Sequence, residues 1–119
     1  MEISINGEIQ TVENIYDLRK AMSAIDREGR VILGRSEEEP ILAIEFMPLG
    51  AKLKYFGTQA GDEYVSGEDK SGKYTLTAGA AKYCQPEPVS PTLARKCAEE
   101  FFQKRKRPKN IIKWRKTAS

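Results

Sequence analysis

Short runs of β-forming residues, separated every few positions by glycine or proline, fill the middle of this chain and restrict its fold more than any other feature. The five runs are residues 31–33, 41–46, 53–56, 63–66 and 73–77. The connections between them leave room for hairpin turns but not for the crossovers of about a dozen residues that parallel strands require. The pattern therefore predicts an antiparallel meander.

The residues before the meander predict a hairpin and a helix. Asn6-Gly7 is a favoured two-residue hairpin turn because both residues tolerate positive φ, so we expect residues 2–12 to form two short strands. Asn14 can cap the helix, Asp17 can complete a capping-box-like pair, and Gly29 can end the helix. The apolar residues of this helix recur at spacings of three and four, which places them on one face: Ile15, Leu18, Met22 and Ile25.

The residues after the meander predict a second helix and a last strand. Ser90 can cap this helix, and Pro91 suits its first position. Four basic residues, 104–107, can stabilise its carboxyl end before Pro108 prevents continuation. We expect residues 111–114 to form the last strand. The apolar stripe of the helix consists of Leu93, Cys97 and Phe101, with Ala94, Ala98 and Phe102 beside it.

Together these elements predict an α+β protein with a single antiparallel sheet, arranged as a meander, and two helices packed on one face. The 119 residues suffice for one domain, which we assign to residues 1–115, with 116–119 as a frayed tail. We find no secretory signal and no apolar stretch of membrane-spanning length, so we expect a cytoplasmic protein, with a monomer favoured. Cys84 and Cys97 lack zinc-knuckle or redox spacing, and we expect reduced thiols packed as small hydrophobic residues.

The chain contains no histidine, which removes the commonest general base at neutral pH, the commonest metal ligand, and both Ser-His and Cys-His nucleophile pairs. Gly57, Gly61 and Gly67 lie in hairpins and not before a helix, so no phosphate-binding glycine pattern occurs. Asp62 and Glu63 are adjacent, so along a strand they would point to opposite faces and make a poor acid–base pair. We therefore expect no enzyme and no cofactor. Catalysis by carboxylates or lysine is the remaining enzymatic alternative.

The charges are unevenly distributed along the chain. Residues 1–70 carry a net charge of −6 and residues 71–119 a net charge of +9, which together give the +3 of the whole chain. Turns at the same end of a meander lie close together, so two of the acidic clusters at these turns could converge. The clusters are either solvated loop tips or an acidic patch for a basic partner. They are Glu37-Glu38-Glu39, Asp62-Glu63 and Glu68-Asp69.

The basic run Lys104–Lys109 also has two interpretations. It can be the carboxyl end of a helix that satisfies the helix dipole, or it can contact nucleic acid. The run lacks the interleaved exposed aromatic residues of a single-strand stacking platform, and no zinc-finger, K-homology or RNA-recognition signature occurs. We do not expect nucleic acid to be the partner, but we keep a nucleic-acid-associated accessory protein, working through residues 104–116, as the alternative function.

Four segments, taken in order, give the chain a family resemblance. They are TVENIYDLRKAMSAI after the first hairpin, YFGTQAGDEYVSG in the meander, LARKCAEEFFQ in the second helix, and the closing RPKNIIKW. In order, spacing and chain length they resemble the immunity proteins found beside nucleic-acid deaminase toxins in bacterial polymorphic toxin systems. One departure is Tyr64, which takes the aromatic position after Asp62-Glu63, whereas the family often has more tryptophan in its central strands.

The resemblance implies inhibition by binding. The protein would occlude the active site or substrate cleft of a cognate toxin, protecting the producing cell without chemistry of its own. A cleft that admits nucleic acid is expected to be basic, so an acidic hairpin could occupy the cleft or its approach. We expect Tyr64 to supply more of the binding energy than the acids around it. The residues expected at the partner surface are Tyr55, Asp62, Glu63, Tyr64, Ser66, Glu68, Asp69, Glu37, Glu38 and Glu39.

Overall fold

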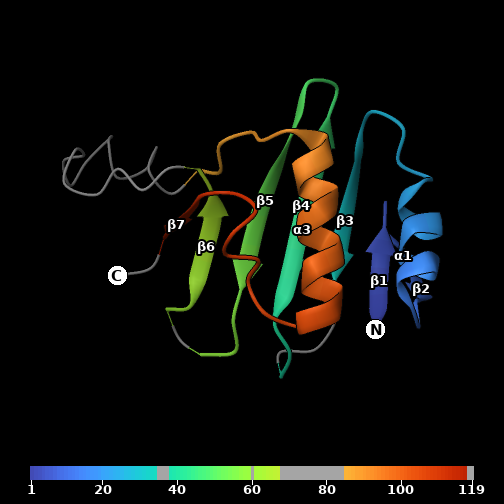
Figure 1. The fold of residues 1–119 in the computed structure, drawn as a ribbon, viewed down its shortest axis with the longest axis horizontal. Helices are drawn as coiled ribbons and strands as arrows, with labels where there is room; N and C mark the ends of the chain where they lie inside the picture. The colour runs from blue at the N-terminus through green and yellow to red at the C-terminus, as the bar shows by residue number, and fades with distance from the viewer. Residues whose placement is uncertain (35–37, 60, 68–84, 118–119) are drawn as a thin grey trace.

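The structure is a computed structural model that describes residues 1–34, 38–59, 61–67 and 85–117. In these residues the chain forms one antiparallel sheet of seven strands, in the order β2-β1-β3-β4-β5-β6-β7, with two helices (Figure 1). The predicted α+β class and single meander sheet are confirmed. The elements, labelled as in Figure 1, are β1 (Glu2–Ile5), β2 (Glu8–Thr11), α1 (Ile15–Met22), β3 (Gly29–Leu33), β4 (Ile41–Met47), β5 (Gly50–Phe56), β6 (Glu63–Ser66), α3 (Pro91–Lys104) and β7 (Trp114–Lys116).

The first hairpin forms as predicted, and its turn also fixes it to the neighbouring strand. Asn6 and Gly7 have φ of 50° and 90°, the left-handed values that this kind of two-residue turn requires. The Asn6 amide donates to the carbonyl of Arg30, and the Asn6 side-chain oxygen accepts from the Arg30 amide, both at 2.9 Å. The turn predicted from local chemistry therefore also joins the hairpin to β3.

Helix α1 begins as predicted but stops well before Gly29. Asn14 accepts a hydrogen bond from the Asp17 amide at 2.9 Å, and Asp17 accepts one from the Glu13 amide at 3.2 Å. Gly29 opens β3 instead, and the side chain of Ile25 occupies the space that a β-carbon at this glycine would need. The predicted end of the helix was therefore wrong, because this glycine makes room for a core side chain.

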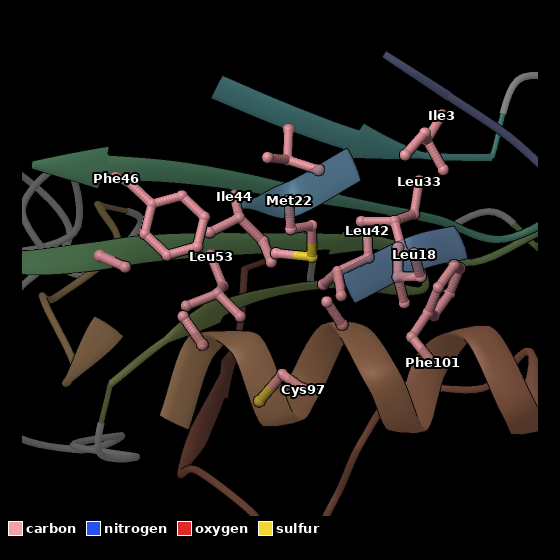
Figure 2. Close-up of a cluster of buried hydrophobic side chains, with 14 of the residues drawn as sticks. Ile3, Leu18, Met22, Leu33, Leu42, Ile44, Phe46, Leu53, Cys97 and Phe101 are labelled. Atoms are coloured by element: carbon pink, nitrogen blue, oxygen red, sulfur yellow. The ribbon is translucent and has the colours of Figure 1, made fainter. Parts of the chain in front are cut away.

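Helix α3 packs its apolar stripe onto the centre of the sheet. Its buried side chains meet those of β4 and β5 in one core, which also takes in Leu18 and Met22 of α1 (Figure 2). Because both helices contribute to the same core, they lie on one face of the sheet, as predicted. The fully buried residues of α3 are Ala94, Cys97, Ala98 and Phe101.

Two arginines join α1 to α3. Arg95 donates to the carbonyls of Met22 and Ile25, at 3.1 and 3.0 Å, and so satisfies the carboxyl end of α1. Arg19 pairs with Glu99 at 2.8 Å, and this hydrogen bond raises the pKa of the Arg19 guanidinium. A helix of eight residues is too short to persist alone in water, so α1 depends on α3 and on burial of its own apolar face.

The central hairpin is longer than predicted because its turn is tight. β4 and β5 pair along their whole lengths, which leaves only Pro48 and Leu49 as the turn. β5 therefore starts at Gly50 and not at Leu53. The strand predicted over residues 73–77 lies outside the described residues, as does Cys84.

The last strand lies later in the chain than predicted. β7 starts at Trp114, whereas Ile111 and Ile112 precede it in a turn, from which Ile112 enters the core. Lys116 pairs with Tyr64 in the sheet, so it does not belong to a frayed tail. The apolar residues of this segment are thus used for packing against the core and not for strand pairing.

Replacing Phe101 with alanine should lower the free energy of unfolding by about 3–5 kcal/mol, because its buried ring would leave a cavity beneath α3. Tyr16→Ala is the matched control, since Tyr16 is 74% exposed and should change stability by less than about 0.5 kcal/mol. Urea unfolding followed by circular dichroism measures both values. Equal losses in the two variants would contradict the role of α3 in closing the core.

Candidate interaction surface

The helices cover one face of the sheet and leave much of the other face open. Side chains alternate along each strand, so in β4 Leu42, Ile44 and Phe46 point into the core. We define the open face as the set of strand side chains that point away from the helices. In β4 these are exposed or half-buried: Ile41, Ala43, Glu45 and Met47.

Two of the three acidic clusters converge at one end of the open face. Glu38 and Glu39 come shortly before β4, and Asp62 and Glu63 lie where β6 begins. Between them Phe56, at the end of β5, pairs with the first residue of β4 on one side and with Glu63 on the other. The starts of β4 and β6 accordingly lie at the same lower end of the sheet in Figure 1. We call Glu38, Glu39, Asp62 and Glu63 the acidic end.

Phe56 is the apolar residue of this region, and it was not among the predicted partner residues. It is 37% exposed on the open face, whereas Tyr55 before it is 6% exposed on the covered face. Strand alternation points the two rings to opposite faces, but only the position of the helices decides which ring is exposed. Strands lie about 4.8 Å apart, so Glu63 of β6 and Ile41 of β4 flank Phe56 at roughly 5 Å, and Glu39 lies two residues before Ile41.

Tyr55 and Tyr64, both expected at the partner surface, point to the helix-covered face. Their ring centroids lie 6.3 Å apart, and Tyr55 also packs edge-on against Phe101 at 6.3 Å. Tyr64 is half-buried, and the guanidinium of Arg107 lies 3.5 Å from its ring centroid. Burial raises the pKa of Tyr55, and the charge of Asp62 raises it further, whereas Arg107 lowers it. Tyr55 is therefore inaccessible to a partner, and Tyr64 is already engaged within the chain.

Ser66, another expected partner residue, is fully buried at 0% exposed. Its hydroxyl donates to the carbonyl of Glu87 at 2.6 Å and accepts from the amide of Leu53 at 3.1 Å. The expectation of a partner contact is corrected, because Ser66 shares the covered face with Tyr64 and joins three segments there. The remaining predicted residues, Glu37, Glu68 and Asp69, lie outside the described residues.

The members of the acidic end differ in accessibility. Glu38, Glu39 and Glu63 are exposed. Asp62 is half-buried, because its carboxylate folds back over Gly57, whose amide donates to the Asp62 carbonyl at 2.7 Å. A side chain at residue 57 would collide with that carboxylate. Asp62 therefore shapes the β5–β6 turn, whereas the other three acids face solvent.

The basic run Lys104–Lys109 is used largely within the molecule. Lys104 forms an ion pair with Glu100 on the same helix, at 3.4 Å. Arg105 ends α3 in the left-handed conformation, with φ of 57°, and lies over the ring of Phe102. Arg107 lies over Tyr64, as described above. These contacts favour the interpretation of the run as a helix end over that of a free basic surface.

The residues that follow the run are also engaged. Trp114 donates from its indole nitrogen to the carbonyl of Pro108 at 2.8 Å. Arg115 is 1% exposed, pairs with Glu87 at 3.0 Å and donates to the carbonyl of Gln85. Within residues 104–116, Arg107 and Arg115 are thus engaged inside the molecule, whereas Lys106, Lys109 and Lys113 are exposed.

The described residues contain one cysteine, Cys97, which is buried. No three His, Cys, Asp or Glu side chains among the described residues gather closely enough to hold a metal ion. Burial raises the pKa of the Cys97 thiol to about 12, so this thiol is unreactive near neutral pH. None of the helices in the described ranges is long and apolar enough to span a bilayer.

Searches against protein-family models and against curated proteins find no match to this chain. The case for a function therefore comes from the geometry above and from the sequence patterns.

Arg107 and Tyr64 should be energetically coupled. Arg107→Ala and Tyr64→Leu each remove the stacked contact, which contributes about 0.5–2 kcal/mol when it is partly buried. A double-mutant cycle in urea unfolding should return a coupling energy in this range. Lys106→Ala is the matched control for Arg107, since Lys106 is exposed and should show no coupling to Tyr64. If both cycles give coupling energies near zero, the contact between Arg107 and Tyr64 does not hold residues 107–114 to the sheet.

Proposed function

We propose that this protein is an immunity protein that binds a cognate nucleic-acid deaminase toxin and occludes its substrate cleft. The observation that carries the proposal is the acidic end, where exposed Glu63 pairs beside the exposed ring of Phe56 and exposed Glu39 lies just before Ile41, its neighbour on the other side. A cleft that admits nucleic acid attracts phosphates, so its lining is basic. The acids complement such a lining in charge. The apolar ring beside them can act as an anchor that excludes water.

The support beneath the acidic end also favours a binding role. Phe56 and Glu63 belong to paired strands, and behind them Tyr64 is held between Tyr55 and Arg107. A surface that is already ordered loses less conformational entropy on association, so more of the contact energy contributes to affinity. Phe56 and Glu63 are thus suited to enter a cleft without rearrangement.

The partner class comes from the sequence resemblance, whereas the geometry supports a basic partner in general. Two segments of the resemblance meet in the structure, because Arg107 of RPKNIIKW lies over Tyr64 of YFGTQAGDEYVSG. The bond from Trp114 to Pro108 closes the same segment on itself. The occurrence of both segments in one chain therefore has a physical basis, since RPKNIIKW supports YFGTQAGDEYVSG beneath the acidic end.

The second candidate is a nucleic-acid-associated protein that works through residues 104–116. Lys106, Lys109 and Lys113 are exposed there, which favours it. Arg107 and Arg115, two of the three arginines in this segment, are occupied within the molecule, which leaves Arg105 as the exposed one suited to bidentate phosphate contacts. This candidate predicts binding to DNA or RNA that weakens steeply with salt.

A tagged pull-down from the native cells, with nuclease added, tests the proposal. We expect one stoichiometric protein that carries a nucleic-acid deaminase domain, identified by mass spectrometry. The deaminase activity of that protein on a nucleic-acid substrate should fall in proportion to added inhibitor, because one molecule blocks one cleft. Retention of nucleic acid without nuclease, and of nothing with it, would favour the second candidate.

Substitutions at the acidic end test where the toxin binds. Glu39→Lys with Glu63→Lys should slow association by about tenfold at low salt, because charge steers the encounter. Phe56→Ala should mainly speed dissociation, because it removes an apolar anchor. Glu8→Lys with Glu13→Lys is the matched control, since both acids are exposed near β2, at the opposite edge of the sheet. Unchanged kinetics in both acidic-end variants would place the toxin on another surface.

A further inference from the structure

A groove crosses the open face of the sheet away from the acidic end. Its larger part, about 770 Å³, lies over β1, β3 and β4, and a smaller part of about 260 Å³ continues over β4 and β5 towards Pro86. Arg30 and Glu45 line both parts, so the two adjoin at these residues. We call the two parts together the central groove.

The smaller part of the central groove carries an excess of positive charge. Lys52 and Lys54 stand two residues apart on β5, so they share the open face at a spacing of about 7 Å. Neither lysine forms an ion pair with any described residue. Arg30 and Glu45 approach each other only to 3.9 Å, with side chains 69% and 55% exposed. Three cations therefore border a single carboxylate, and Glu28 lines only the larger part.

The floor of the central groove is aliphatic. Ile32, Ala43 and Met47 are half-buried side chains of β3 and β4 that line it. An extended peptide presents alternate side chains on one face, spaced like those of a strand. Such a peptide can place aliphatic side chains on this floor and carboxylates against Lys52 and Lys54. We propose that the central groove binds an extended segment of a partner protein in which acidic and aliphatic side chains are interspersed.

The lining of the groove favours a peptide over a single-stranded nucleic acid. Proteins that bind single strands without sequence preference stack the bases on exposed aromatic rings. Among the described residues that line the groove, Phe46 is the one aromatic side chain, and it is buried in the core. Cations above an aliphatic floor suit carboxylates and aliphatic side chains, and they offer no surface on which a base can stack.

This inference does not rest on the proposed inhibition of a toxin. The occupant of the central groove is acidic, whereas the partner of the acidic end is basic. The two surfaces are altered by different substitutions, so either can fail without the other.

Fluorescence anisotropy of a labelled synthetic peptide of alternating glutamate and valine, titrated with the full chain at low salt, tests the groove. We expect saturable binding that weakens with salt, because the contacts are between charges near solvent. Lys52→Glu with Lys54→Glu should weaken binding by about tenfold or more. Lys20→Glu with Lys96→Glu, at exposed helical lysines, should leave it unchanged.

Two further probes complete the experiment. A peptide with glutamine in place of glutamate should bind at least about tenfold more weakly, because the charges are lost. A labelled single-stranded oligonucleotide of the same length should bind more weakly than the acidic peptide. If the charge reversal unfolds the chain by circular dichroism, Lys52→Gln with Lys54→Gln replaces it. Any of three results would overturn the proposal. They are failure of the acidic peptide to bind, equal binding by the Lys52/Lys54 and Lys20/Lys96 variants, and tighter binding of the oligonucleotide than of the acidic peptide.

Discussion

The close packing of α3 on β4 and β5 is the contact on which the rest of the structure depends. Ala94 and Ala98 present little bulk to the sheet, and Cys97 and Phe101 fill the space beside them. Burial of this face supplies much of the driving force for folding, since apolar surface leaves water there. It also decides which side of each strand is covered. The exposed side chains of the acidic end and of the central groove face solvent because α3 occupies the opposite face.

The elements of the fold were largely predictable because their signals are local. Asn6-Gly7, Asn14 and Ser90 act through hydrogen bonds or backbone angles within a few residues, so their roles follow from the sequence. Gly29 was misassigned because its role depends on the path that brings Ile25 over β3. The last strand was misplaced for a similar reason, since its apolar residues serve the core beneath α3 before the chain enters the sheet.

The candidate site was predictable in its charge but not in its orientation. Acids at turns are visible in the sequence, yet the turns that share an end of the sheet follow only from the strand order. Alternation made Tyr55 and Phe56 equal candidates for exposure, and the position of α3 selects Phe56. The engagement of Tyr64 by Arg107 joins segments far apart in the chain, so no local pattern could show it.

The acidic end and the cationic smaller part of the central groove give one face two opposite charges, an arrangement that would fix the orientation of a partner as well as attract it. Hydrogen–deuterium exchange of the protein, alone and bound to its captured toxin, tests the use of this face most directly. The account predicts slower exchange at residues 38–40 and 57–63 in the complex, with residues 105–110 unchanged. Slower exchange at residues 105–110, with no change around Phe56, would contradict it.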